Sequence, residues 1–463
     1  MGIFNRIFTS DSFDKPIGRG TAIKSIIAGL AGLYSGKLFA GKKGRVIVIG
    51  AGVAGLAAAR DLEKAGIEAI VVEAQNRIGG RLYTDKSMGV SLDFGASWIH
   101  ESGSSHPIQK LGQKLNVRVS ETDHSSYYMF DYRGKRIADE TAIAYAKAAD
   151  ELIGQAAELA ESEDATATAA LNYVAKKEGL SARQREFLFW RVAALEAAAA
   201  EDLGKMGDES EGDAFGDDEY AFKDGYETIS NGLARGLKIK KKHLVKKVSQ
   251  NAKGVTVYTN KGKFKADAAL VTVSAGVLKK NKIKFSPGLP RAKKQALSRI
   301  GMGTLNKIAL KFDRQFWPND RHFIGYVGKK KGYYASFLNY AHINGAPVLV
   351  CFSAGSNARK AERYSDKRVK KEAMAVLKKI FGNKMSKLTG FKRTKWNSNP
   401  YTYGSYSHVK VNGTGRDRKK LAEPFERIFF AGEATSVEYP GTVHGAYLSG
   451  VKAARELIAA ANE

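Results

Sequence analysis

The pattern of apolar and polar residues near residue 45 predicts a strand, a helix and a second strand. Residues 45–49 read RVIVI, a continuous apolar run that is typical of a buried parallel strand. A glycine-rich turn follows, then a helical pattern over residues 53–65 and a second apolar run, IEAIVVE, over residues 67–73. This order is that of a βαβ unit, in which a helix joins two parallel strands.

The remaining pattern continues the mixture of helices and strands. Residues 140–203 are rich in Ala, Glu, Lys and Leu and predict helices. The strand-like segments that follow are residues 254–259, 268–273, 307–312, 347–352 and 427–431, and a final helix covers residues 445–461. We find no internal repeat and no low-complexity linker, so the sequence predicts an α/β fold (α+β overall) without an appended module.

The turn after the first strand carries a dinucleotide-binding pattern. Gly50, Gly52 and Gly55 form GxGxxG, with Ala54 before the last glycine. The first glycine permits the tight turn, the second lets a pyrophosphate approach the backbone, and the third lets helix and strand pack closely. Glu73 ends the next strand, where its carboxylate can accept the hydroxyl hydrogen bonds of an adenosine ribose. Such hydrogen bonds imply an unphosphorylated 2′-hydroxyl, which argues against NADP in this site.

A second glycine pair follows shortly after Glu73, in the segment Arg77-Ile-Gly79-Gly80-Arg81. Its glycines also allow close backbone approach. Arg81 can pair with a phosphate through two parallel hydrogen bonds. We therefore expect Arg81 to contact the cofactor.

These residues resemble the flavin-dependent amine oxidases, and most closely the polyamine oxidases. The resemblance runs from about residue 44 to the C-terminus and is carried by separated motifs. The motifs are the dinucleotide pattern with Glu73 and residues 77–81, GASWIH at 95–100, FGDD at 215–218 with GYE at 225–227, GMGTLNK at 301–307, Trp396 ten residues before Tyr406, and FAGEAT at 430–435 with YPGTVHGAY at 439–447.

The resemblance implies two discontinuous domains. A Rossmann-like FAD-binding domain comprises residues 44–104, 225–300 and 395–463. A substrate domain, a mixed sheet flanked by helices, comprises residues 105–224 and 301–394. We expect the flavin ring at the boundary between the two domains.

The resemblance also implies cofactor contacts late in the chain. Val245 is expected to contact the adenine through its backbone, and Glu433, in the Gly432-Glu433 pair, to hold the ribityl chain. Thr442 and Val443 are expected at the pyrimidine edge of the flavin. Trp396 is expected to pack beside the ring.

The resemblance gives the catalytic candidates their roles. Tyr406 and Tyr439 are expected to flank the flavin and orient the amine, partly through cation–π attraction. Lys307 is expected to contact flavin N5 through a water molecule and to aid flavin reduction and reaction with O2. His100 is expected near the substrate, as a hydrogen-bonding or proton-accepting group. Glu196 is a candidate for binding a cationic amine tail.

The alternation along residues 307–312 gives a second interpretation of the lysines there. Ile308, Leu310 and Phe312 share one face of the expected strand, and Lys307, Ala309 and Lys311 share the other. Alternation alone indicates a solvated edge. We accept that interpretation for Lys311.

The cysteine content bears on how the flavin is attached. Some monoamine oxidases bind flavin to a cysteine in the loop after the Gly-Glu motif, but here Ser436-Val-Glu-Tyr439 contains no thiol. Cys351 is the single cysteine and lies in an apolar run, so we expect it to be buried and inert. We therefore expect non-covalent FAD.

The charge and the N-terminus leave two questions open. The formal net charge is +28, which favours polyanions rather than a cationic substrate. The acidic stretch 208–219 could provide an acidic entrance. Residues 1–43 contain basic residues and a short apolar run, so they predict either a Tat-like export signal or an amphipathic arm on a cytoplasmic protein.

We therefore expect an enzyme that oxidises amines, with polyamines as the substrates that the motifs favour, O2 as acceptor and H2O2 as product. The alternatives are an L-amino-acid or monoamine oxidase and a lysine-directed oxidase associated with nucleic acid. The basic run 238–247 motivates the last alternative, but it overlaps an expected strand of the FAD domain. A solvated sheet edge explains those lysines better than a nucleic-acid site.

Overall fold

The computed structural model describes residues 44–162, 166–207 and 218–462 of the chain. The N-terminal segment 1–43 and most of the acidic stretch, including residues 215–217 of the FGDD motif, lie outside the described residues. Among the described residues, no helix combines the length and the apolar composition needed to cross a bilayer.

The predicted βαβ unit forms the centre of a five-stranded parallel sheet. Strand β1 (Arg45–Ile49) pairs with β2 (Glu68–Val72) on one side and β13 (Ala268–Val271) on the other, and α2 (Val53–Lys64) follows β1. The outer strands are β22 (Ile428–Phe430) and β9 (Lys238–Lys240), giving the order β22-β13-β1-β2-β9. The chain runs from β1 to β2 and β9 on one side and later returns to β13 and β22 on the other, so the strand order reverses at β1. A crevice is expected at the carboxyl end of β1, where this reversal occurs.

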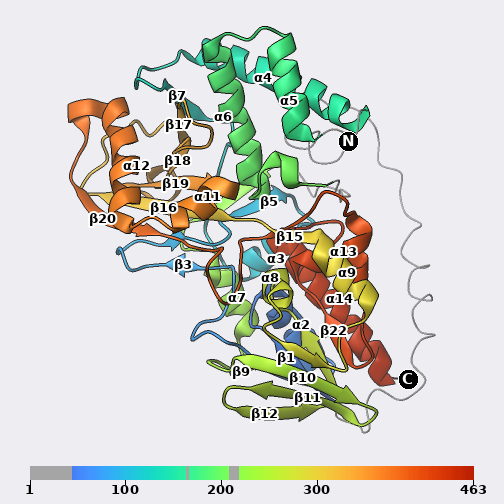
Figure 1. Cartoon of the computed structure of the whole chain (residues 1–463). Coiled ribbons are helices and arrows are strands. Elements are labelled where there is room, and N and C mark those ends of the chain that lie inside the picture. The colour runs from blue at the N-terminus through green and yellow to red at the C-terminus, as the bar shows by residue number, and fades with distance from the viewer. Residues whose placement is uncertain (1–43, 163–165, 208–217, 463) are drawn as a thin grey trace.

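Helices cover this sheet and build the first core. Helix α14 (Val443–Asn462) lies along α2, and α7 (Glu227–Ala234) and α3 (Pro107–Lys114) complete the layer (Figure 1). Leu56, Leu62 and Ile229 are buried there, and so is Ile108 of α3. The domain boundaries remain a prediction. Ile108 packs in the core of the five-stranded parallel sheet, so α3 contacts this sheet although the predicted boundary assigns residues 105–224 to the substrate domain.

A second sheet covers the other face of the first. Its order is β12-β11-β10-β14, and its strands are β10 (Val245–Asn251), β11 (Gly254–Thr259), β12 (Gly262–Ala266) and β14 (Lys284–Ser286). Val248 and Val257 pack against Ile47 and Val271 of the parallel sheet. The basic run 238–247 spans β9, a turn and the start of β10, and its lysines are exposed, as expected for a solvated edge.

The upper part of Figure 1 holds a six-stranded sheet with the order β20-β16-β19-β18-β17-β7. Its strands are β7 (Tyr127–Asp131), β16 (Leu305–Phe312), β17 (Phe323–Val327), β18 (Ser336–Asn339), β19 (Val348–Ala354) and β20 (Leu388–Arg393). Helix α12 (Asp366–Phe381) packs on one face. Helices α4 (Asp139–Ser162), α5 (Ala167–Lys177) and α6 (Ala182–Ala199) form the expected helical region beside it.

One prediction from alternation is wrong. Strand β16 is an internal strand, because β19 pairs with one edge and β20 with the other. Ala309 is therefore fully buried, and Lys311 is partly buried and donates from Nζ to the Met88 carbonyl at 2.6 Å. Alternation separates the two faces of a strand, but it does not report whether each face is covered.

Candidate active site

A single cavity of about 2220 Å³ runs from the glycine-rich turn to helix α6. Its walls include residues from the parallel sheet, the four-stranded sheet, the six-stranded sheet and α14. Every cofactor and catalytic residue singled out above lines it except Gly55, which lies within α2. Sites for one small ligand usually have about 300–1000 Å³. The larger volume can hold a dinucleotide and a substrate together.

The glycine-rich turn has the shape that a pyrophosphate site requires. Gly50 has φ +112°, a conformation that favours glycine, and a Cβ at Gly55 would lie 2.1 Å from the Gly50 carbonyl oxygen. A Cβ on Gly52 would meet nothing within 4 Å, because Gly52 faces the cavity. The backbone is therefore open to a ligand where α2 begins, and α2 presents its free N–H groups there.

Glu73 lies where the sequence analysis expects it, at the carboxyl end of β2. Its carboxylate accepts from the Ala51 N–H at 2.9 Å and from the Gln75 N–H at 2.8 Å. Burial raises the pKa of Glu73 despite these hydrogen bonds. The two backbone donors fix the carboxylate at the cavity wall, where it suits a ribose hydroxyl pair.

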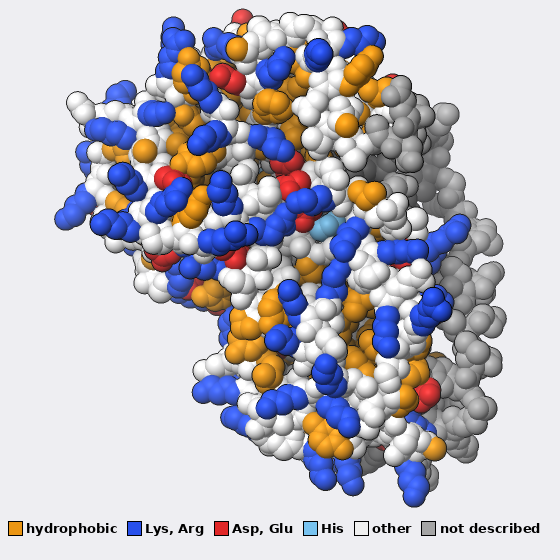
Figure 2. Space-filling model, in the orientation of Figure 1, with side chains coloured by type: hydrophobic (Ala, Val, Ile, Leu, Met, Phe, Trp, Pro, Cys, Tyr) orange, Lys and Arg blue, Asp and Glu red, His pale blue; other side chains and the backbone are white. Residues whose placement is uncertain are grey.

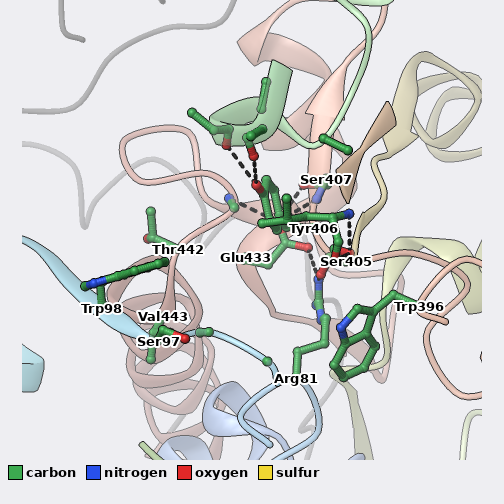
Figure 3. Close-up of a pocket in the computed structure, with 18 of the residues that line it drawn as sticks. Arg81, Ser97, Trp98, Trp396, Ser405, Tyr406, Ser407, Glu433, Thr442 and Val443 are labelled. Carbon is green, nitrogen blue, oxygen red and sulfur yellow. Dashed lines mark hydrogen bonds and ion pairs between the residues drawn. The ribbon is translucent and has the colours of Figure 1, made fainter. Parts of the chain in front are cut away.

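Arg81 and Glu433 form an ion pair between the glycine-rich segment and the C-terminal motif (Figure 3). Arg81 Nη1 donates to Glu433 Oε1 at 2.6 Å and to the Ser405 carbonyl at 3.1 Å. Glu433 Oε2 accepts from Ser407 Oγ at 2.6 Å and from the Gly441 N–H at 3.1 Å. Although burial alone would raise the pKa of Glu433, the Arg81 and Arg418 charges hold it below its usual value.

The residues around this pair fit a bound flavin nucleotide. Val245, Thr442 and Val443 line the cavity, and Trp396 is buried beside Arg81 with its indole N–H donating to the Phe94 carbonyl at 3.1 Å. The open glycine turn, the fixed Glu73 carboxylate and these apolar walls lie along one cavity. Arg418 was not anticipated from the sequence. It is fully buried and donates to Ser407 Oγ at 2.7 Å, behind Glu433.

Lys307 is buried in the cavity wall, with 3% of its surface exposed. Its ammonium donates to the Asp93 carbonyl at 2.9 Å, to the Gly95 carbonyl at 2.7 Å and to Ser97 Oγ. Burial lowers the pKa of Lys307, and the neighbouring Asp93 charge only partly offsets this effect. A buried lysine with a lowered pKa beside a ligand cavity is typical of a functional site.

Asp93 is a second buried residue that the sequence analysis did not identify. Its carboxylate accepts from Thr84 Oγ1 at 2.5 Å and from the Tyr226 N–H at 3.0 Å. Burial raises its pKa, since desolvation disfavours the charged form. Lys307 donates to the Asp93 carbonyl, and this contact joins β4 (Leu92–Asp93) to the six-stranded sheet. The sequence could have indicated this buried carboxylate only through the acidic residue between two apolar ones in the segment 92–94.

Tyr406 and Tyr439 both line the cavity, from separate loops. The Tyr406 hydroxyl donates to the Ala197 and Ala198 carbonyls of α6 at 2.8 and 2.9 Å, which fixes the ring (Figure 3). The Tyr439 ring contacts the edge of the His444 ring, with centroids 4.8 Å apart. Both rings therefore line the cavity, and their placement on the two sides of a flavin remains a prediction.

His100 lies on β5 (Trp98–Ser102), with about half of its side chain facing the cavity. Its Nδ1 is 2.8 Å from Glu219 Oε2, and His124 Nε2 is 3.9 Å from the same oxygen. Glu219, on β8 (Asp218–Phe222), was not identified individually, although it is the last residue of the acidic stretch. Figure 3 shows Trp98, the neighbour of His100, on the far side of the cavity from Trp396.

Glu196 also lines the cavity, but its charge is balanced by a neighbour. It is 5% exposed and its Oε1 accepts from Lys331 Nζ at 2.6 Å. Binding of an amine tail by Glu196 remains a prediction, and it would have to compete with Lys331.

Known proteins resemble this chain over most of its length. The family described as flavin containing amine oxidoreductases matches residues 53–458. Polyamine oxidase 4 of Oryza sativa subsp. japonica is 36% identical over 434 residues, covering 89% of this chain and 88% of that protein. Polyamine oxidase 2 of Arabidopsis thaliana is 34% identical, covering 89% and 87%.

Two further comparisons differ in coverage or in identity. Lysine-specific histone demethylase 1 homolog 2 of Arabidopsis thaliana is 34% identical, but the match covers 91% of this chain and only 59% of that protein. A solved structure of wild-type putrescine oxidase bound to putrescine has a TM-score of 0.72 at 21% identity and covers 90% of this chain and 99% of that one. This likeness confirms the predicted fold class. The sequence matches, taken with the site, show that the chain belongs to the flavin containing amine oxidoreductases and is a flavin-dependent amine oxidase.

Proposed function

We propose that the enzyme oxidises polyamines with O2, using non-covalently bound FAD, and releases an aldehyde, an amine and H2O2. The observation that carries the substrate proposal is the Glu219 carboxylate, which lies at the wall of the same cavity as the dinucleotide turn. The names of the plant relatives support the same substrate class.

The chemistry divides between the cofactor and the chain. The flavin, when bound, accepts a hydride equivalent from the carbon next to the substrate nitrogen. The substrate nitrogen next to that carbon must be uncharged, because its lone pair stabilises the positive charge that develops as the hydride leaves. The apolar and aromatic walls, including Tyr406, Tyr439 and Trp98, disfavour an ammonium by desolvation. The ring faces of Tyr406 and Tyr439 then attract the developing positive charge.

Glu219 is proposed to bind a distal ammonium of the substrate. Its side chain is partly buried, with 23% of its surface exposed. Among the described residues, Oε2 lies 2.8 Å from His100 and 3.9 Å from His124, and Oε1 accepts a long hydrogen bond, 3.3 Å, from the Glu101 N–H. A polyamine carries several ammonium groups along one flexible chain. One group can therefore remain charged at Glu219 while another nitrogen, in the aromatic part of the cavity, loses its proton.

Lys307 is proposed to act beside the flavin through a water molecule. Its three described acceptors, the Asp93 and Gly95 carbonyls and Ser97 Oγ, orient the ammonium at the cavity wall. A fixed cation at this point stabilises negative charge that develops during flavin reduction and reaction with O2.

Non-covalent FAD is proposed from two observations. Glu73 beside the glycine turn suits an adenosine ribose, which FAD contains and FMN lacks. Cys351 is completely buried in β19, and burial raises the pKa of its thiol well above the usual range. The one thiol of the chain is not among the residues that line the cavity.

A peroxide-coupled assay of the purified protein tests the proposal. The substrates are spermine, spermidine, putrescine, butylamine, L-amino acids and a peptide with a methylated lysine. We expect H2O2 from the polyamines and none under anaerobic conditions. Activity confined to the L-amino acids or to the methyl-lysine peptide would replace the polyamine proposal.

The mode of cofactor binding needs its own test. Acid precipitation should release all of the yellow chromophore to the supernatant, and mass spectrometry should identify it as FAD. Flavin retained in the pellet would contradict non-covalent binding.

A further inference from the structure

A second cavity of about 500 Å³ opens outside the flavin site, next to the two-stranded sheet formed by β15 (Ile300–Met302) and β21 (Ser407–Val409). Four lysines line it, and they are Lys205, Lys279, Lys280 and Lys410. Figure 2 shows Lys and Arg side chains over the visible face, including the region of α8 (Ala275–Lys279), α9 (Arg291–Arg299) and α13 (Gly415–Ala422).

Two of these ammonium groups lie close to each other. Lys279 and Lys410 both donate to the Ser298 carbonyl, at 3.4 and 2.9 Å, and Lys279 also donates to the Ile300 carbonyl. Burial, together with the charge of Lys410, lowers the pKa of Lys279 to about 8. Like charges held on one carbonyl repel each other unless an anion balances them.

The carboxylates near the cavity are already engaged. Glu201 lines it, but its two oxygens accept from Arg359 at 2.8 and 2.5 Å. Lys205 is paired with Asp202 at 2.6 Å. In the described part of the chain, none of the other three lysines forms an ion pair, so the cavity keeps a surplus of positive charge.

His408 forms part of the cavity wall and has an unsatisfied polar atom. It is 6% exposed, and its Nδ1 has no hydrogen-bond partner among the described residues. Burial lowers its pKa to about 4, so the imidazole is neutral and one ring nitrogen carries a proton. Gly301 lies opposite His408 in the sheet, and a Cβ there would lie 2.1 Å from His408 Nε2, so this glycine makes room for the ring.

We propose that this cavity binds a small phosphate-bearing anion, held by Lys279, Lys280 and Lys410 with His408 as a hydrogen-bonding group. Lysine ammonium groups bind phosphate as point charges, and the volume suits a small phosphate ester. Met302, Tyr403 and Val411 add apolar surface for the organic part of such an ester. His408 and Tyr403 also line the flavin cavity, so the two cavities share a wall, but this proposal does not depend on which amine is the substrate.

Isothermal titration calorimetry of the flavin-loaded full chain at constant ionic strength tests the site. The probes are inorganic phosphate, ribose 5-phosphate, uncharged ribose and a short single-stranded oligonucleotide. We expect the two phosphate compounds to bind and ribose not to bind. Tighter binding of ribose 5-phosphate would identify an ester site, and tighter binding of inorganic phosphate a site for the free anion.

Charge variants locate the binding. Lys279→Gln combined with Lys410→Gln should weaken phosphate binding by about tenfold or more, since hydrogen bonds to charged groups are strong. The matched control is Lys263→Gln with Lys265→Gln, two exposed lysines on β12, which should leave the affinity unchanged. If the first variant does not fold, Lys280→Gln removes an exposed charge of the same cavity and should still weaken binding.

Three results would overturn the proposal. The first is no heat from either phosphate compound at millimolar concentration. The second is equal loss of affinity in the β12 control, which would assign the binding to the general positive field. The third is binding of the oligonucleotide alone, which would indicate a surface for a polymer.

Discussion

At the residue scale, substitution of Lys307 gives the most direct test of the proposed catalytic residues. Its ammonium is buried at the cavity wall, where it donates to two backbone carbonyls and to Ser97 Oγ. We expect Lys307→Met to slow steady-state turnover by one or more orders of magnitude while FAD stays bound. Turnover and flavin absorbance of the purified variant give both quantities.

Lys311→Met is the matched control for this variant. Lys311 lies two residues further along β16, donates to the Met88 carbonyl and does not line the cavity. It should leave turnover within about twofold of the wild type. If Lys307→Met is equally unimpaired, Lys307 has no part in the reaction.

The His100–Glu219 pair should make substrate affinity depend on pH. Burial alone lowers the pKa of His100, but the Glu219 charge and hydrogen bond outweigh it and hold the pKa above the usual 6.5. Below this pKa the imidazolium neutralises Glu219. Above it the carboxylate attracts the distal ammonium, so KM for putrescine should fall as pH rises through the pKa of His100.

Two comparisons isolate the pair. His100→Gln should remove this step in KM, and Glu219→Gln should raise KM for putrescine by about tenfold above the pKa of His100 and by much less below it. Butylamine has no distal ammonium, so its KM should respond to neither substitution. An unchanged pH profile in His100→Gln would separate His100 from amine binding.

The same pair has a stability consequence with a definite sign. The raised pKa of His100 stabilises the fold below 6.5, and this contribution is lost as pH rises through the folded-state pKa. The pKa of Glu219 is lowered: burial acts to raise it, but the His100 charge prevails. That contribution is present above 4.5 and is lost as pH falls through the folded-state value.

At the element scale, the strand–turn–helix unit depends on the absence of a side chain at Gly55. A Cβ there would lie 2.1 Å from the Gly50 carbonyl oxygen and 2.8 Å from Thr272 Oγ1. Gly55→Ala must therefore push α2 away from β1. We expect a loss of about 1–3 kcal/mol of stability and a lower flavin content, measured by thermal unfolding and by the ratio of absorbance at visible and ultraviolet wavelengths.

Gly154→Ala is the control within a helix. Gly154 lies inside α4, and a Cβ there would meet nothing within 4 Å. Alanine should stabilise the protein slightly, by about 0.5–1 kcal/mol, because it restricts the unfolded chain. Equal destabilisation by both substitutions would show that the close approach at Gly55 has no special importance.

At the scale of the whole molecule, the net charge opposes a cationic substrate. The chain carries +28, and Figure 2 shows Lys and Arg side chains spread over the whole face with few acidic groups between them. Long-range fields between exposed charges are screened by salt, with a Debye length of about 30 Å at 0.01 M and about 8 Å at 0.15 M. Encounter with a polycation should therefore become easier as salt is added.

We expect kcat/KM for spermine to rise severalfold between about 0.01 and 0.15 M ionic strength. Butylamine, with one charge, should show a smaller rise. Stopped-flow measurement of flavin bleaching at low substrate concentration would measure it directly. A fall with added salt would reveal an acidic entrance strong enough to dominate the field.

Much of the fold and of the cofactor site could be predicted from the sequence because the signals are local. The strand at 45–49, the glycines of the turn and Glu73 lie within one βαβ unit, and the structure has them as expected. The final helix, predicted at 445–461, spans Val443–Asn462. Each of these features follows from the periodicity of apolar residues or from the spacing of residues within the dinucleotide-binding motif.

What the sequence by itself determined is therefore the dinucleotide turn, the order of the main elements and the family-matched positions of Lys307, Tyr406 and Glu433. The tertiary structure alone decided which charges are buried and which groups meet. It placed β16 inside a sheet, brought Glu219 to His100 and Asp93 to Lys307, and put Lys279 beside Lys410. The three side-chain contacts join residues more than a hundred positions apart. Burial depends on what covers a face, which no local pattern of residues records.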